Sequence, residues 1–518
     1  MTQITQMNTE RARWLSGMLL TVALLAGTSL KAASVRIALD APGYKGERAL
    51  LYRYMDLFTL RTELIGQATI DQQGKATIDA AVNGTGKATI RIGAVHCDVW
   101  LRSGPYRIGF PVPRAGTPRS LNGTTEVIPE FKELDKLDIN ALIGDLNQRL
   151  DDFIAEDLAT DQQAGMQAVD IARKAERPQP TDSVTRPGTL FITPGWSSAR
   201  VDSFENKLRG YYNEVKDPWF WQNLEYGIAG LRFGPRVNDR DLFDRYLKGK
   251  PVLHDVPEYV RFIGSFFEGH LLRYPFRAHE EGLTSWIRAA EPDTVKKLFA
   301  EHDFLKDDAL CELVMMSQLY AHYPGKLFDR AGILRILERL STASPHAEHR
   351  VIAANMRWDL TAMRIGGTLP PLVLRDLQGS QVRIDTSLHD ATCLVITASW
   401  CTYCEQELVA LETLYKEYGA YVHLVGISLD KSTKDLDAYK KAHPGRDWPW
   451  YFGGDDPTIM DLLRIRTIPA FFLLNGNSIA QAPAPPPSNG MAAVLHRIRT
   501  QADEENRSRP DQGPPPRR

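Results

Sequence analysis

The segment ASWCTYCEQEL (residues 398–408) places two cysteines two residues apart, directly after a tryptophan and directly before a run of helix-forming residues. The preceding segment ATCLVITAS (391–399) has the pattern of a buried strand, so Cys401 falls at a strand-to-helix junction. The unpaired amides and partial positive charge of a helix N-terminus stabilise a thiolate, which is the nucleophilic form of cysteine. Cys404, nearly one helical turn further on, is close enough to attack a mixed disulfide formed at Cys401. The spacing therefore supplies an attacking thiol and a resolving thiol.

A metal site and an ordinary piece of core are the alternatives for this pair. A metal site of this type needs a second pair of ligands, and Cys97, Cys311 and Cys393 form no second Cys-x-x-Cys motif. Accidental core cysteines would not sit together after a tryptophan at such a junction. We therefore favour redox chemistry, with no metal and no cofactor. Cys393 lies in the expected central strand and should be a buried, inert thiol.

Residues 366–482 alternate between strand and helix patterns, which predicts an α/β domain with a central sheet covered by helices on both faces. One expected hairpin turns at Gln378-Gly379 and another at Asn475-Gly476. Residues 483–518 should hold a last helix and a proline-rich tail. The segment PAPPPS (483–488) and the tail are too proline-rich and polar to pack, and we expect the end of the chain to be disordered.

The stretch Trp400-Cys401-Thr402-Tyr403-Cys404, followed about 65 residues later by Thr467-Ile468-Pro469-Ala470, resembles the thioredoxin-like fold. Within that superfamily it resembles extracytoplasmic TlpA/ResA-type thiol-disulfide oxidoreductases over about 115 residues. The hairpin GTLPPLVLRDLQG (367–379) and Glu407, three residues past Cys404, are further points of likeness. The resemblance implies a redox-active Cys401–Cys404 disulfide. It also implies a cis Ile468-Pro469 bond, since cis bonds are nearly confined to proline, and a substrate-binding role for Trp400, Ile468 and Pro469.

The sequence departs from the thioredoxin pattern in ways that affect proton transfer. Val395 stands where thioredoxins have a buried aspartate, six residues before the first cysteine. Glu407, on the same helix face as Cys404, is the candidate to take over proton handling, and a solvated helix glutamate is the alternative. Glu405 and Glu407 are negative neighbours that disfavour a thiolate, which favours a reductant over an oxidant. The resemblance points the same way, because TlpA/ResA-type proteins are reductases fed by a membrane electron donor.

The N-terminus predicts export. Arg11 and Arg13 precede the apolar run WLSGMLLTVALLAG (14–27), and small residues follow up to Ala33. This pattern is typical of a secretory signal peptide over residues 1–33, with an uncleaved anchor as the alternative. Both interpretations place the remainder outside the cytoplasm, in the periplasm or cell envelope.

The rest of the chain is expected to form three further regions. Short strands with turn signals predict a β-rich, sandwich-like domain over 34–130. Residues 131–194 should hold a helix, starting near Asp138, and a linker, and residues 195–365 a helical domain. In the last of these, His346 and His349 have the helical spacing of a metal pair. No third ligand is evident, so we favour a solvated helix start.

These observations favour an exported thiol-disulfide oxidoreductase that reduces disulfides of other exported proteins. The alternative is a binding or adaptor protein in which the β and helical regions recognise a partner and the thioredoxin-like domain is secondary. A peroxidase of the peroxiredoxin type is excluded, because Ser399 stands where its threonine would be, with no proline in the preceding strand. The near-neutral net charge of -2 gives no electrostatic case for a nucleic-acid partner.

Overall fold

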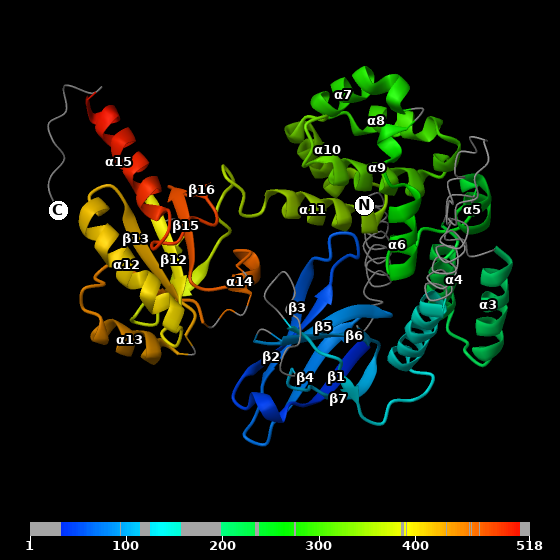
Figure 1. Ribbon diagram of the computed structural model, residues 1–518, viewed down its shortest axis with the longest axis horizontal. Coiled ribbons are helices and arrows are strands. Elements are labelled where there is room, and N and C mark those ends of the chain that lie inside the picture. Colours follow the sequence, from blue (N-terminus) through cyan, green and yellow to red (C-terminus); the bar gives the residue numbers. More distant parts are fainter. Residues whose placement is uncertain are drawn as a thin grey trace, which may run out of the picture.

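The structure is a computed structural model that describes residues 33–93, 95–113, 125–156, 198–233, 238–273, 276–384, 388–389, 391–430, 432–454, 456, 458–465 and 467–507. The expected signal segment, most of the expected linker and the end of the proline-rich tail lie outside these residues. Figure 1 shows three parts, which we name the β part (33–131), the helical part (139–361) and the α/β part (366–507). Within the described ranges, no helix combines the length and apolar character that crossing a membrane requires.

The β part forms two sheets, with strand orders β4-β1-β7-β9 and β3-β2-β5-β6-β8. Its strands are β1 (Ala33–Asp40), β2 (Arg48–Tyr54), β3 (Thr62–Thr69), β4 (Lys75–Val82), β5 (Gly86–Ile92), β6 (Val95–Leu101), β7 (Gly104–Gly109), β8 (Thr125–Glu126) and β9 (Glu130–Phe131). Successive residues of a strand point to opposite faces, and alternate residues of β1 are accordingly buried. Ile37 of one sheet and Ile90 of the other join the same hydrophobic core. Strand sheets are thus present as predicted, and their packing as a sandwich stays a prediction.

The helical part begins at residue 139, as predicted from the change of period near Asp138. Residues 139–156 are helical, and the later helices are α3 (Ser198–Tyr211), α4 (Pro218–Gly230), α5 (Asp239–Tyr246), α6 (Pro257–Phe266), α7 (Glu280–Ala289), α8 (Pro292–Glu301), α9 (Asp308–His322), α10 (Arg330–Ala343) and α11 (Ala347–Thr361). Side-chain caps fix several helix starts because they satisfy amides that lack a helical partner. Asp217, Asn238, Asp307 and Asp329 each accept a backbone N–H in this way.

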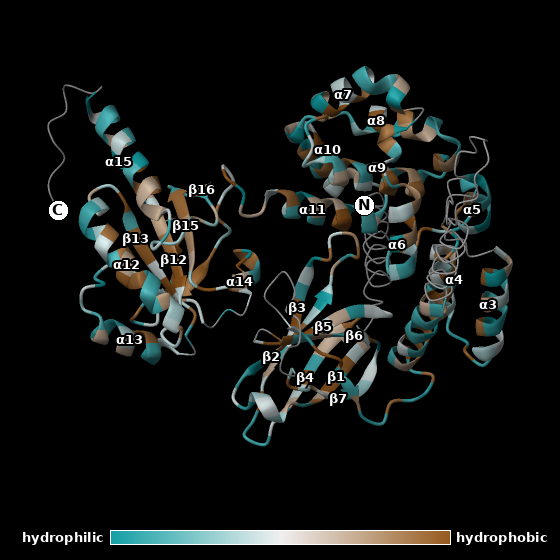
Figure 2. Cartoon of the chain, viewed as in Figure 1, coloured by the Kyte–Doolittle hydropathy of each residue, from teal (hydrophilic) through white to brown (hydrophobic). Residues whose placement is uncertain are grey.

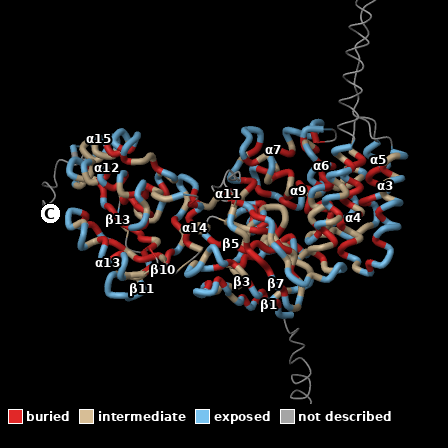
Figure 3. Tube along the Cα trace, turned by 60° about the horizontal axis from the view of Figure 1, so that its bottom comes forward, coloured by how far each residue is buried: buried red, intermediate tan, exposed pale blue. Residues whose placement is uncertain are grey.

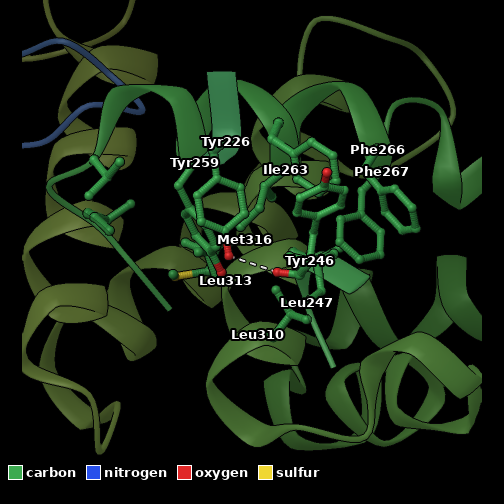
Figure 4. Close-up of a cluster of buried hydrophobic side chains, with 14 of the residues drawn as sticks. Tyr226, Tyr246, Leu247, Tyr259, Ile263, Phe266, Phe267, Leu310, Leu313 and Met316 are labelled. Atoms are coloured by element: carbon green, nitrogen blue, oxygen red, sulfur yellow. Dashed lines mark hydrogen bonds between the residues drawn. The ribbon is translucent and has the colours of Figure 1, made fainter. Parts of the chain in front are cut away.

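One hydrophobic core runs through the helical part. Helix α9 lies within it and buries residues around almost its whole circumference (Figure 3). Aromatic side chains fill much of the remaining space, and the hydroxyl of Tyr226 donates a hydrogen bond to the backbone carbonyl of Tyr246 at 2.7 Å (Figure 4). Most aromatic residues of this region are therefore core residues, and Tyr211 is an exposed exception.

The α/β part has a seven-stranded sheet of order β11-β10-β14-β13-β12-β15-β16. Its elements are β10 (Val373–Arg375), β11 (Gln381–Arg383), β12 (Thr392–Thr397), α12 (Thr402–Tyr418), β13 (His423–Ser428), α13 (Thr433–Ala442), β14 (Trp450–Phe452), α14 (Ile459–Leu462), β15 (Ala470–Asn475), β16 (Ser478–Gln481) and α15 (Met491–Arg507). Strand β12 is buried throughout, and it pairs parallel with β13 and antiparallel with β15. The central strands are apolar (Figure 2).

The central strand of this sheet divides the core of the α/β part into two. Cys393 and Val395 of β12 face a core that α12, α13 and α15 share, whereas Leu394 and Ile396 face one that contains Ile459 of α14. Helices thus cover both faces, as the alternating pattern predicts. The short strand β14 was not expected from the sequence; its three residues join the sheet between β10 and β13.

The prediction that the segment PAPPPS would not pack is wrong. Ala484 is buried in the core, and its amide donates a hydrogen bond to the backbone carbonyl of Phe471 at 2.7 Å. Four of the segment's six residues are prolines, which have no backbone N–H group that would need a partner in the core. The segment packs against the sheet and leads into α15, whose Met491 and Leu495 are also buried.

Candidate functional site

Cys401 and Cys404 are joined by a disulfide at the start of α12. Cys401 is the N-cap residue, and the backbone N–H of Cys404 points at its Sγ atom at 3.1 Å. Cys404 is buried, whereas Cys401 is partly exposed. Once the disulfide is reduced, Cys401 is the sulfur that another molecule can reach, and its thiolate would face the amides of the helix N-terminus.

The structure brings the distant Ile468-Pro469 pair to the disulfide. The peptide bond between these residues is cis, and the backbone carbonyl oxygen of Ile468 lies 4.0 Å from the Sγ atom of Cys401. Trp400 and Tyr403, beside the cysteines, expose 65% and 58% of their surfaces. Exposed aromatic side chains of this size provide contact area for a polypeptide partner. Trp400, Ile468 and Pro469 therefore lie around the accessible sulfur.

Glu407 is buried on the first turns of α12 and is not a solvated helix residue. Its carboxylate accepts hydrogen bonds from the backbone N–H of Ser488 at 3.0 Å and from the Ser488 hydroxyl at 2.6 Å. A hydrogen bond from Tyr403 to the same carboxylate raises the pKa of Tyr403. Val395 lies in the apolar core, so β12 provides no acid at that position. Glu407, three residues after Cys404, is thus a buried carboxylate of α12 close to the pair.

The expectation that the negative charge of Glu405 disfavours a thiolate is wrong, because a cation compensates this charge. Arg446, whose side chain is buried, donates to both carboxylate oxygens of Glu405 at 2.5 and 2.8 Å and to Glu412 at 2.5 Å. The Tyr439 hydroxyl donates to Glu405 at 2.9 Å, and the His443 ring lies 3.4 Å from it. The hydrogen bonds from Arg446 hold the pKa of Glu405 below its usual value. The charge of Glu405 is thus compensated, and its proximity to the cysteines is no evidence for a reductant.

Asp430 is a site neighbour that the sequence interpretation missed. It is buried just after β13, and its Oδ1 atom accepts the Ser399 amide at 2.9 Å and the Ser399 hydroxyl at 2.8 Å. Its Oδ2 atom accepts the Ser428 hydroxyl at 2.6 Å. The parallel register of β12 and β13 pairs Thr397 with Ser428, which places residues 399 and 430 at the same edge of the sheet. The pairing of the two predicted strands was the signal from which Asp430 could have been found. Asp430 fixes the backbone at Ser399, just before Trp400.

The remaining cysteines are buried and unpaired. Cys97 lies in the β part and Cys311 in the helical part, and they form no bond with each other. Burial raises the pKa of each, and also that of Cys393, to about 12. Their thiolate fraction at neutral pH is therefore negligible, as expected for inert thiols.

His349 contradicts the prediction of a solvated helix start after Pro345. Its ring is completely buried, and its Nδ1 atom lies 2.9 Å from a carboxylate oxygen of Glu312 in α9. His346, at the N-cap of α11, is partly exposed. The apolar surface of α11 turns His349 inward, because it packs against α9 and α10.

Comparison with known proteins agrees with this geometry. Residues 365–481 match the model of the AhpC/TSA family. Two curated relatives, the thiol-disulfide oxidoreductases ResA of Geobacillus thermodenitrificans and Geobacillus kaustophilus, are each 24% identical over 127 residues, which is 24% of this chain and 72% of theirs. Similar solved structures include a thiol:disulfide interchange protein from a Bacteroides species (15% identity, TM-score 0.24, covering 26% of this chain and 90% of that one). A thioredoxin-like protein from Bacteroides caccae covers 46% of this chain and 91% of its own (13% identity, TM-score 0.25).

These findings confirm the resemblance inferred from the cysteine motif. The C-terminal region, residues 365–481, matches the AhpC/TSA family and is similar to curated ResA thiol-disulfide oxidoreductases, in agreement with a thioredoxin-like domain of the TlpA/ResA type.

Proposed function

We propose that this protein works outside the cytoplasm as a reductase for disulfides of exported proteins, using Cys401 and Cys404. The observation that carries the proposal is the arrangement at the start of α12. A partly exposed Cys401 lies beside the Ile468 carbonyl, and a buried Cys404 follows one turn later. The apolar segment behind Arg11 and Arg13 supports export.

The reaction needs two exchange steps. The Cys401 thiolate attacks one sulfur of a substrate disulfide, which forms a mixed disulfide and releases the other substrate sulfur as a thiolate. The Cys404 thiolate then attacks Sγ of Cys401, which releases the second substrate sulfur and forms the Cys401–Cys404 disulfide. Two electrons pass to the substrate, and the released thiolates take up protons.

Glu407 is the group that we propose to accept a proton from Cys404. It is three residues further along α12, and both side chains are buried. Trp400, Ile468 and Pro469 would hold the substrate chain during the first step. A membrane electron donor would return the disulfide to the dithiol form, as the TlpA/ResA resemblance implies.

Contacts of the β and helical parts with the α/β part support a second role for these two parts, in recognising a partner. Both contact the segment that leads to Pro469, through Arg91 of β5 and Asp359 of α11. An adaptor role for these parts is therefore compatible with the reductase activity.

Insulin reduction tests the proposal. Reduced full-length protein should precipitate the insulin B chain, Cys401→Ser should abolish this, and Cys404→Ser should accumulate a mixed disulfide with the substrate. Equal activity of wild type and Cys401→Ser would refute the proposed function. Substrates trapped from an envelope extract by Cys404→Ser would identify the physiological partners.

A further inference from the structure

A group of titratable side chains meets in the helical part, outside the cysteine site. Helix α9 contributes Asp308 and Glu312, the N-terminal turn of α11 contributes His346 and His349, and α8 contributes Lys296. Glu312 and His349 are buried, and His346 lies at the surface edge of the group. Neither the cysteine chemistry nor the resemblance accounts for them.

The geometry of three of these residues suits a metal ion. One ligand atom each from Glu312, His346 and His349 lies within 4.8 Å of the other two. The closest pair, Glu312 Oε1 and His349 Nδ1, is 2.9 Å apart. Ligands at about 2.0–2.2 Å from a tetrahedral zinc ion lie roughly 3.3–3.6 Å from one another. The upper limit of 4.8 Å for the three ligand atoms is thus about 1.2–1.5 Å above the spacing that a zinc ion requires.

Unpartnered ring nitrogens provide a second, independent observation. The Nε2 atom of the fully buried His349 has no hydrogen-bond partner among the described residues. The Nε2 atom of His254, in the loop before α6, is likewise buried without a partner in that part of the chain. The His349 ring lies 4.7 Å from the His346 ring and 5.1 Å from the His254 ring. Buried polar atoms normally have partners, so the free Nε2 atoms of His349 and His254 point to an absent partner. For His349 this nitrogen lies across the ring from Nδ1, so an ion held through Nε2 leaves the Nδ1 contact with Glu312 in place.

The surrounding charges also favour a cation. Lys296 lies 2.8 Å from Asp308 and 3.1 Å from Glu312, so one ammonium faces two carboxylates. One net negative charge is left while the imidazoles are neutral. Asp308 Oδ2 lies 3.0 Å from Nε2 of His346, a contact that resembles the carboxylate–histidine pairs which orient metal-binding imidazoles.

We propose that Glu312, His346 and His349 form a binding site for a divalent transition metal of the zinc type. Two imidazoles and one carboxylate are a donor set that suits zinc. His254 is the neighbour placed to offer a further nitrogen. The ion would join α9 to the start of α11. Asp359, which contacts Arg464 of the α/β part, belongs to the same helix α11.

His346→Asn is the discriminating variant. It removes an imidazole at a partly exposed position, and asparagine is a favoured N-cap residue, so the start of α11 is retained. The matched control is His279→Asn, an exposed histidine at the N-cap of α7. Full-length protein is used with its Cys401–Cys404 disulfide oxidised, because free thiolates would bind zinc themselves.

Zinc binding is measured by equilibrium dialysis and elemental analysis, and thermal unfolding is followed with and without zinc. We expect one zinc per chain in wild type and His279→Asn, at least tenfold weaker binding in folded His346→Asn, and a zinc-dependent rise in Tm only in the first two. Absence of stoichiometric zinc in folded wild type would overturn the proposal, and so would unchanged binding by His346→Asn.

Discussion

Arg91 of β5 contacts both carboxylate oxygens of Asp461 in α14, at 3.0 and 3.1 Å, although 370 positions separate the two residues. Three residues later, Arg464 donates to the backbone carbonyl of Asp359 at 2.8 Å and to its carboxylate at 2.9 Å. The β and helical parts thus both hold the short segment that leads to Ile468-Pro469. This segment borders the accessible sulfur of Cys401.

Loosening that attachment should affect large substrates more than small ones. We expect Arg91→Ala to lower the rate of insulin reduction severalfold and to leave the rate with a small aromatic disulfide unchanged, because only the polypeptide needs the Ile468 backbone. The Arg91–Asp461 pair is partly exposed, and such pairs contribute about 1 kcal/mol or less, so the fold should persist. Arg36→Ala, which removes the exposed Arg36–Asp79 pair of the β part, is the control. An equal loss with both substrates would contradict a positioning role.

Cys401 should be the most reactive thiol of the reduced protein. It combines partial exposure with a helix N-terminus, whereas burial raises the pKa of Cys97, Cys311 and Cys393 to about 12. Brief iodoacetamide treatment at neutral pH, followed by mass mapping, should therefore find the label on Cys401. Denatured protein, in which all five cysteines react, calibrates the peptides. Preferential labelling of any of the three buried thiols would contradict this assignment.

Glu407→Gln should slow the resolving step. Glutamine keeps the shape of the side chain and can accept from Ser488, but it cannot take a proton from Cys404. A general base contributes about 10²-fold or more, so the mixed disulfide at Cys401 should persist long enough to be detected by rapid-quench mass spectrometry. The initial attack should keep its wild-type rate. If the mixed disulfide decays at the wild-type rate, Glu407 has a structural role through Ser488 only.

Arg446→Met should destabilise the α/β part and make Cys401 less acidic. Losing the charged hydrogen bonds of Arg446 should cost roughly 1.5–3 kcal/mol, because Glu405 and Glu412 lose their cation but stay partly exposed to water. The uncompensated Glu405 at the first turn of α12 should raise the pH midpoint of Cys401 alkylation. Adding Glu405→Gln should reverse the alkylation shift even where stability is not restored. A midpoint that stays constant across the three proteins would show that this pair does not influence the thiolate.

Protonation of His270 should lower the free energy of unfolding in weak acid. Burial lowers its pKa to about 4, with a further contribution from the nearby His302. An unfolded histidine has a pKa of about 6.5, so the unfolded chain binds more protons between these values. The contribution of neutral His270 to the free energy of unfolding is complete above about pH 6.5. It is lost as the pH falls toward 4, and the loss is roughly 2 kcal/mol at pH 5.

The measurement for His270 is the difference in unfolding free energy between pH 7.5 and pH 5. His270→Asn should reduce this difference by about 2 kcal/mol whatever its effect at pH 7.5. The exposed His279→Asn should retain the wild-type difference. The idea fails if His270→Asn keeps the full pH dependence.

The sequence revealed those features that depend on neighbours along the chain. The Cys-x-x-Cys pair at the start of α12 and the strands and helices around it follow local periodicity and turn residues. The Ile468-Pro469 pair came from a resemblance to a known pattern. Residues that depend on tertiary packing were missed or misjudged. Arg446 compensates Glu405 from 41 positions away, and His349 is turned inward by the packing of α11 on α9. The polar, proline-rich composition of PAPPPS suggested that the segment would not pack, whereas its one alanine, Ala484, is small enough to fit the core.

The contact between Ser488 and Glu407 bears on where this oxidoreductase module ends. The region shared with the AhpC/TSA family stops at residue 481, before Ala484, Ser488 and α15. A chain cut there would lose the two hydrogen bonds on the Glu407 carboxylate and the side chains of Met491 and Leu495 from the core beside α12. The smallest portable unit, one that could be grafted onto another protein with its chemistry intact, should therefore extend to Arg507.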